Sequence, residues 1–412
     1  FTTVRSYEMP LKTCIINKTK KENFMQVYFS DLIACVPKDL FEKIGAEFKI
    51  DRCNHKLTGK SLFQILLYNL CEENQISLRV IEDSFNNHQF KLYHNGKPLK
   101  ASKSGISDRL KTINYKYYES IFMTLQDTFS KKISKHNKQQ VKRFDSTLIT
   151  LSSKLLKNGF KVPIGEKHQI KFSIGFDGLP RTVRIGSTKS DMSENVALRN
   201  AIKQASLSKD DIAVFDRGIS ARKTFKDFSK SGINFVTRLN ADANYRVIEQ
   251  RPLEKVNLKD SENCELEIVS DSIVQLRSRD VHWVKENFRL IEGINKTTKK
   301  TFLFLSNIID LSAIEITEIY KSRWDIEVFF KFIKQHLNTK HFLSRNLNGI
   351  KVVFYMILIA ALLILTFKIT NKIESFKFAK RRFVEQLRRA LTYDIIYLYR
   401  DNPERFRQSF DF

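Results

Sequence analysis

Apolar residues recur at helical spacing through the first third of the chain. Four stretches carry this pattern, at residues 38–48, 59–71, 78–85 and 107–129. A spacing of three and four residues places such side chains on one face of a helix, where they can pack against a core. We therefore expect residues 1–135 to form a helical N-terminal domain.

The pattern changes near residue 141, where polar and apolar side chains begin to alternate as in a β-strand. The expected elements are a strand at 141–151, a hairpin of 169–176 and 181–185, a helix at 194–206, a strand at 211–216 and a helix at 221–231. Asp177 and Gly178 supply the tight turn of the hairpin. This order is that of a ribonuclease-H-like sheet, so residues 136–232 are expected to form the first part of such a core.

A long stretch without a helical pattern follows Gly232. Its strand-like segments lie at residues 235–239, 245–248, 264–270, 273–277, 288–291 and 301–306. We interpret residues 233–310 as an all-β insertion in the core. Residues 311–372 then supply the last helices of the core, and residues 373–412 form a basic helical tail. The expected fold class is mixed α/β.

Residues 311–337 read as one long helix, because no Gly or Pro interrupts them. Ser312 followed by Glu315 forms a capping box at its start. At about 100° per residue, four polar side chains fall within roughly 60° of one another: Tyr320, Arg323, Glu327 and Lys334. An apolar stripe lies beside them: Ile326, Phe330, Ile333 and Leu337. For this spacing alone, a solvated face with ordinary i,i+4 ion pairs is the favoured explanation.

The charge balance points to a polyanionic partner. The chain has 71 Lys and Arg against 45 Asp and Glu, a formal net charge of +26. An excess of this size, spread along the chain, is typical of proteins that bind nucleic acid. The helical N-terminal domain could therefore recognise DNA ends, with a recognition helix opening at Ser104 to Arg109 and Lys111, or it could simply support the next domain.

Cysteine usage and hydropathy bear on the compartment. The chain has five cysteines and no CxxC pair, which favours free thiols in a reducing compartment. The apolar run 352–367 is shorter than the roughly 20 residues that a bilayer requires, so we expect a buried core helix and no membrane. The start of the sequence has no secretory signal pattern. We expect a cytoplasmic, nucleoid-associated bacterial protein.

Two aspartates occupy strand positions where a carboxylate is costly unless it is paired or binds metal. Asp145 lies in the middle of the first expected strand, and Asp216 ends a buried one. If these strands are neighbours, the two carboxylates approach each other, and Mg²⁺ would relieve their repulsion. Glu327 would supply a third oxygen ligand. Three carboxylates can hold two cations about 4 Å apart, an arrangement suited to phosphodiester chemistry. Taken singly, Asp145 could be a strand-edge residue and Asp216 a turn-former.

These residues carry a resemblance to a known family. The spacing Tyr320-x2-Arg323-x3-Glu327-x6-Lys334 resembles the Y-R-E-K signature of DDE insertion-sequence transposases of the IS-four family. The segments 144–147 (FDST) and 214–218 (VFDRG) resemble the surroundings of that family's two aspartates. The similarity covers roughly residues 140–370, including a β insertion at the place where the family has one.

The resemblance implies roles for individual residues. Asp145, Asp216 and Glu327 would be the catalytic, metal-binding triad, holding Mg²⁺ or Mn²⁺, with two ions expected. The DNA contacts that it implies are Tyr320, Arg323 and Lys334, which would grip phosphates, with Arg217 as a further phosphate contact and Trp283 stacking on a flipped base. Arg217 could equally form a salt bridge. A core position is the stronger expectation for Trp283 and also for Trp324.

The activity implied is that of a DNA transposase. Such an enzyme binds the terminal inverted repeats of its own element as a homodimer on double-stranded DNA. Water cuts the strand with metal assistance, and the freed 3′-hydroxyl attacks target DNA. Two alternatives remain at this point: a structure-specific nuclease of the same fold that cleaves without joining, and an inactive DNA-binding derivative. The presence of all three acids disfavours the second.

Overall fold

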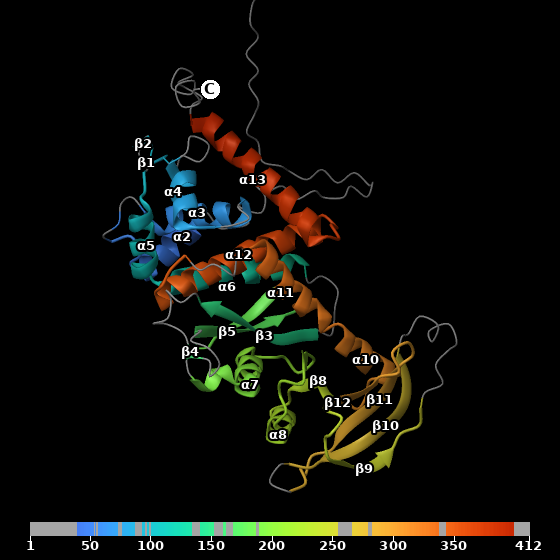
Figure 1. The fold of residues 1–412 in the computed structure, drawn as a ribbon. Helices are drawn as coiled ribbons and strands as arrows, with labels where there is room; N and C mark the ends of the chain where they lie inside the picture. The colour runs from blue at the N-terminus through green and yellow to red at the C-terminus, as the bar shows by residue number, and fades with distance from the viewer. Residues whose placement is uncertain are drawn as a thin grey trace, which may run out of the picture.

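The computed structural model describes most of the chain (Figure 1). The described residues are 39–52, 54, 57–72, 76–86, 93–94, 97–98, 100–133, 141–151, 160–161, 168–186, 189–253, 266–278, 282–337 and 343–398. The expectations for residues 1–38 and 399–412 lie outside these residues.

The expected core elements are confirmed in their order and type. Strand β3 (Val141–Leu151) precedes β4 (Phe160–Lys161), the hairpin β5 (His168–Phe176) and β6 (Pro180–Ile185), the short helix η3 (Lys189–Met192), helix α7 (Glu194–Gln204), strand β7 (Ile212–Phe215) and helix α8 (Arg222–Lys230). In the hairpin turn Gly178 has φ +102°, a conformation that residues with a side chain rarely adopt. β5 pairs antiparallel with β3, β3 runs parallel to β7, and β7 runs parallel to β8 (Asn234–Leu239).

The β-rich insertion continues the core sheet. Strand β12 (Thr301–Ser306) pairs antiparallel with β8, and β11 (Phe288–Asn295), β10 (Leu266–Leu276) and β9 (Tyr245–Gln250) follow in turn. Strands β3 to β12 thus form one ten-stranded sheet. The expectation of two strands at 264–270 and 273–277 is wrong. They form one strand with a bulge between Ile268 and Ser270, and the polar Asp271 that interrupts the apolar pattern is buried against Arg289.

Helices cover both faces of the core part of this sheet (Figure 1). On one face, β5 buries Ile170, Phe172, Ile174 and Phe176 in a core shared with α6 (Tyr115–Ile133), α11 (Trp324–His336) and α12 (Leu347–Thr370). The rings of Phe172 and Phe354 stack 3.8 Å apart there. On the other face, α7 and α8 pack on β7 around Phe215. Helix α10 (Ala313–Lys321) packs on β8 and β12.

Helix α12 is the centre of the helical layer. By length and composition it could cross a membrane, but 94% of its most apolar window is buried inside the protein. It packs against α3 (Gly59–Glu72), α5 (Lys103–Thr112), α6 and α13 (Phe376–Leu398). The expectation of a buried core helix is met by this packing. The described N-terminal helices, which include α2 (Leu40–Glu47) and α4 (Leu78–Asn86), share one continuous core with it. The short strands β1 (Tyr93–His94) and β2 (Lys97–Pro98) pair with each other.

The single helix expected at 107–129 is instead two helices. α5 ends at Thr112 and α6 starts at Tyr115. Asn348 of α12 explains the break, because its side-chain amide donates hydrogen bonds to the carbonyls of Leu110 and Ile113. Arg109, expected on a recognition helix, is 5% exposed and bound to Asp51. Its guanidinium is therefore not available to DNA.

Candidate metal centre

Asp145 and Asp216 come together where β7 ends beside the middle of its parallel neighbour β3. Phe144 of β3 lies opposite Phe215, the last residue of β7, so an aspartate follows at the same level on both segments. The expected proximity of the two carboxylates is confirmed. One carboxylate oxygen from each, together with one from Glu194, forms a group in which all three atoms lie within 4.8 Å of one another.

Glu194 was missed by the sequence reasoning. It is the first residue of α7, which begins directly after η3, and its carboxylate lies beside those of Asp145 and Asp216. Its carboxylate packs against Gly218, where an added Cβ would lie 2.4 Å from the Glu194 Cγ and 2.8 Å from an Asp216 oxygen. Because Gly218 has no side chain, the carboxylates of Glu194 and Asp216 can approach each other at this position. An acid opening the first helix after the hairpin was the only sequence signal.

Backbone amides and one buried lysine hold the group. The Gly218 amide donates to Asp216 Oδ1 at 2.8 Å, and the Ser146 amide donates to Asp145 Oδ1 at 2.7 Å. Lys171 on β5 is 5% exposed, and its ammonium donates to the Met192 carbonyl just before α7. Burial lowers the pKa of Lys171, while the charges of Glu194, Asp216 and Asp145 act in the opposite direction.

Neighbouring groups of the protein do not fully offset the cost of burying these carboxylates in their charged form. Burial raises the pKa of Asp145 to about 7; the Ser146 amide opposes this rise, and the charges of Asp216 and Glu194 add to it. Burial and the nearby Asp216 also raise the pKa of Glu194. A divalent cation between these groups would favour their charged forms. The donors are all carboxylate oxygens, the ligands preferred by hard cations such as Mg²⁺ and Mn²⁺. The residues therefore fit a metal of this class.

Glu327 lies on α11, and the helix expected at 311–337 is not continuous. α10 ends at Lys321 and α11 begins at Trp324. At the break, the amides of Arg323, Asp325 and Ile326 bond to carbonyls three residues back, as in a 3₁₀ turn. The capping box of Ser312 and Glu315 is confirmed, and the apolar stripe Ile326, Phe330, Ile333 and Leu337 is buried.

Arg143 explains the break between α10 and α11. It lies on β3 two residues before Asp145, and its Nε donates to the Ser322 carbonyl at 2.8 Å. Its guanidinium also pairs with Asp325 at 3.1 Å. The Ser322 carbonyl thus binds Arg143 and the Asp325 amide, and not the Ile326 amide with which it would pair in a continuous α-helix. The same contacts fix the start of α11 relative to the strand that carries Asp145.

Glu327 faces the cavity that Asp145 also lines. The cavity has a volume of about 430 Å³ and is lined by Asp145, Ser146, Thr147, Glu327, Phe330, Lys331, Lys334 and Gln335. Glu327 is outside the group of three close carboxylates, and its Oε1 accepts a 2.5 Å hydrogen bond from Arg323. The third metal ligand assigned to Glu327 therefore stays a prediction. Lys334, expected at DNA phosphates, lines the same cavity.

Tyr320 and Arg323 lie together beside this cavity. The Arg323 guanidinium lies 5.7 Å from the centre of the Tyr320 ring, which also contacts Phe304. Desolvation would lower the pKa of Arg323, but interactions with Tyr320 and Glu327 outweigh it and raise that pKa. The Arg323 guanidinium is therefore paired with the Glu327 carboxylate, and a DNA phosphate could compete with that carboxylate for it.

The remaining candidates are all exposed to some degree. Arg217 is exposed, and no carboxylate of the described residues lies within salt-bridge distance of it. Trp283 is 37% exposed, with the Arg246 guanidinium 4.7 Å from its ring centre, so the core position expected for it is wrong. The core expectation for Trp324 is also wrong, since this residue opens α11 and is 62% exposed. The Trp283 ring lies beside the guanidinium groups of Arg246 and Arg277 rather than in the core.

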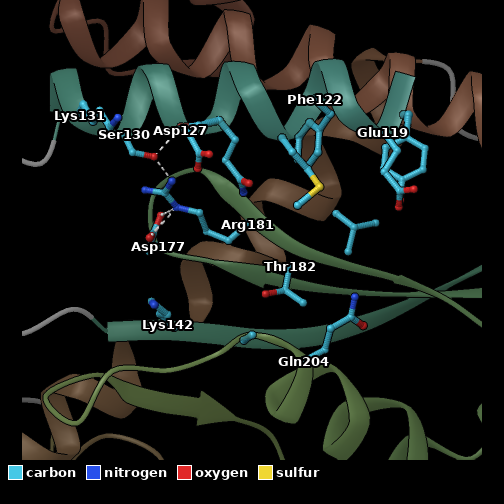
Figure 2. A pocket seen from close by; sticks show the side chains of 15 residues that line it. Glu119, Phe122, Asp127, Ser130, Lys131, Lys142, Asp177, Arg181, Thr182 and Gln204 are labelled. Atoms are coloured by element: carbon cyan, nitrogen blue, oxygen red, sulfur yellow. Dashed lines mark hydrogen bonds and ion pairs between the residues drawn. The ribbon is translucent and has the colours of Figure 1, made fainter. Parts of the chain in front are cut away.

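Another cavity, of about 520 Å³, lies between α6 and the hairpin (Figure 2). Within it Arg181 binds both oxygens of Asp177 and also contacts Ser130. Asp145 and Glu327 do not line it. The acidic group of Asp145, Asp216 and Glu194 is therefore the candidate site.

Comparison with known proteins shows which family models and relatives the chain matches. A family model described as "Transposase DDE domain" matches residues 136–363, more than half of the chain, and a "Domain of unknown function" matches residues 25–97. A putative transposase for insertion sequence element IS4SA from Synechocystis sp. is 26% identical over 65% of this chain and 72% of its own length. A putative transposase y4zB from Sinorhizobium fredii is 27% identical over 36% of this chain and 40% of its own.

One solved structure is similar over most of the chain. It is the piggyBac transposase synaptic complex with hairpin DNA, with a TM-score of 0.45 and 10% sequence identity. The match covers 92% of this chain and 84% of the other.

Proposed function

The chain belongs to the family of transposases with a DDE domain, and on this premise we propose how it acts on its element. As a member it is a DNA transposase, a metal-dependent enzyme that cleaves and joins DNA. We propose that it binds the terminal inverted repeats of its own insertion sequence as a homodimer that pairs two ends, in the cytoplasm and at the nucleoid. The metal would be Mg²⁺ or Mn²⁺, with two ions at each site.

The observation that carries this proposal is the meeting of Asp145 and Asp216 where β7 ends beside β3, next to a cavity that Glu327 and Lys334 also line. Asp145, Asp216 and Glu327 are the proposed ligands. The bound cations would activate the attacking oxygen and stabilise the leaving oxygen of a phosphodiester. Cleavage adds water across a P–O3′ bond and leaves a 3′-hydroxyl. In joining, that hydroxyl forms a new P–O bond with target DNA, and the target releases its own 3′-oxygen.

Polar side chains at the α10–α11 break and on α11 are the proposed DNA contacts. Tyr320, Arg323 and Lys334 would contact phosphates next to the scissile bond, and Arg217 would contact a further one, supported by its exposure and lack of a carboxylate partner among the described residues. Trp283 would stack on an unpaired base, supported by its exposed ring beside Arg246 and Arg277. Stacking contacts of this kind contribute about 1–3 kcal/mol per base.

The test uses duplexes that carry the ends found in the DNA flanking the reading frame. With Mg²⁺ or Mn²⁺, the protein should cut at the element end and join that end to a target plasmid, while Glu327→Gln should bind the duplex without cutting it. Undiminished cutting by Glu327→Gln would remove Glu327 from the site. Cutting by the wild type without any joined product would indicate a nuclease instead.

A further inference from the structure

The third carboxylate nearest to the paired aspartates comes from α7, not from the helix that carries Glu327. We propose that Glu194 is a metal ligand, and that Asp145, Asp216 and Glu194 together hold the first divalent cation in the DNA-free protein. This inference rests on the proposed function, since it concerns the metal on which the cleavage depends. It adds a ligand that the two strand aspartates and the α11 glutamate do not provide.

Distance is the first argument. The three ligand oxygens lie within 4.8 Å of one another, a span that a cation with oxygen ligands at about 2.0–2.6 Å can bridge with little movement. Side chains of opposite charge do not account for the position of Glu194. Among the described residues its carboxylate makes no ion pair within 4.0 Å, although Lys171 acts on it electrostatically.

The surroundings of Glu194 are the second argument. Gly218 provides both the amide that binds Asp216 and the empty space that the Glu194 side chain fills. Lys171, buried below the group, binds the Met192 carbonyl two residues before Glu194 and so fixes the start of α7. These contacts bring a third carboxylate close to two others without neutralising it with a partner. That arrangement costs free energy unless a cation is bound.

The state of Glu327 is the third argument. In this structure Arg323 binds its carboxylate, which lies outside the close group. Without DNA, Glu327 therefore already has a cation of its own. Among the described residues Glu194 has no ion pair within 4.0 Å, only the longer-range charge of Lys171, so its carboxylate is available to the metal before a phosphate competes for Arg323.

The experiment measures Mn²⁺ binding to the full-length, DNA-free protein by calorimetry and by the paramagnetic resonance of free Mn²⁺. Loss of one anionic ligand should weaken binding substantially, so we expect Glu194→Gln and Asp145→Asn each to raise the Kd about tenfold or more. Glu327→Gln should change it less than about twofold. Asp210→Asn, an equal change of charge at an exposed position outside the group, should also leave it nearly unchanged.

Glu194→Asp separates ligation from net charge and protects the test against a folding defect. It keeps the charge and an acidic first turn of α7 but shortens the side chain by one methylene. A ligand should lose affinity on this change, whereas a distant charge should not. A Kd for Mn²⁺ that is unchanged in both Glu194→Gln and Glu194→Asp would overturn the proposal.

The two proposals fail in different ways. If the wild type binds Mn²⁺ and cuts element ends while Glu194→Gln binds Mn²⁺ as the wild type does, only the role of Glu194 is wrong. If the wild type neither binds Mn²⁺ nor cuts element ends, the proposed function fails and the inference fails with it.

Discussion

The Asp145 carboxylate is a buried charge beside a second acid, and its position makes the metal-free protein sensitive to pH. Its pKa is about 7 in the folded protein, against an ordinary value of 3.8. Between these two values the folded state holds a proton that the unfolded state has lost. Stability contributed by this group is therefore complete at low pH and is lost as the pH rises towards 7.

We predict that Asp145→Asn stabilises the metal-free protein at pH 8 but has little effect near pH 4. The gain should exceed about 1 kcal/mol, because each pKa unit corresponds to roughly 1.4 kcal/mol. The measurement is urea unfolding in the presence of a chelator across this pH range. A gain that does not grow between pH 4 and pH 7 would show that Asp145 titrates at its ordinary pKa.

Arg323, just before α11, binds the Glu327 carboxylate in this structure and is the proposed phosphate contact in the DNA complex. We predict that Arg323→Ala weakens binding to element ends and lowers the slope of log K against log salt by about 1. The slope comes from fluorescence anisotropy titrations at several salt concentrations. If it stays the same, the ion pair with Glu327 is structural and the phosphate contact is absent.

At the scale of elements, the break between α10 and α11 determines where the Glu327 side chain lies. Arg143 binds the Ser322 carbonyl, which also accepts from the Asp325 amide, and so ties the break to β3, the strand that carries Asp145. Strand β3 therefore carries Asp145 directly and also fixes the start of α11, the helix that carries Glu327. The position of Glu327 depends on this strand through Arg143.

We predict that Arg143→Ala lowers the free energy of unfolding by about 2 kcal/mol, because a charged hydrogen bond to a partly buried carbonyl is lost. Asp325→Ala is the matched control. It removes only the ion pair, whose carboxylate is 57% exposed, and should cost less than about 1 kcal/mol. Denaturant unfolding measures both. Equal losses in the two variants would place the stabilisation in the ion pair instead.

At the scale of the molecule, the insertion and the core share one sheet, and a buried ion pair fastens the insertion to the next helix. Asp271 of β10 accepts two hydrogen bonds from Arg289 of β11, at 2.9 and 2.7 Å. Arg289 also donates to the carbonyls of Ile309 and Leu311, just before α10. The position of α10 therefore depends on a side chain of the insertion.

We predict that Arg289→Ala costs about 3–5 kcal/mol, since it leaves the Asp271 carboxylate buried without its partner. Replacing both residues by apolar ones, Asp271→Leu with Arg289→Met, should recover part of this loss. Chemical denaturation of the single and double variants tests the idea. A loss below about 1 kcal/mol in the single variant would mean that water reaches Asp271.

The local structure of individual segments could be predicted from the sequence. The alternation of residues 141–151, the turn at Gly178 and the capping box of Ser312 depend on neighbours a few residues apart, so periodicity and turn chemistry predicted them. Asp145 and Asp216 were found for the same reason. A charged residue in an apolar strand is visible without knowing which strands are adjacent.

Contacts between distant segments were decided by the tertiary structure alone. Glu194 joins the acidic group because the start of α7 lies beside Asp145 and Asp216, and no spacing in the sequence encodes that distance. The break at Ser322 depends on Arg143, 179 residues earlier. The exposure of Trp283 and Trp324 and the continuity of the sheet into the insertion likewise follow from packing. Hydrophobic patterns specify which face is buried, but the partner of a polar group is chosen by the fold.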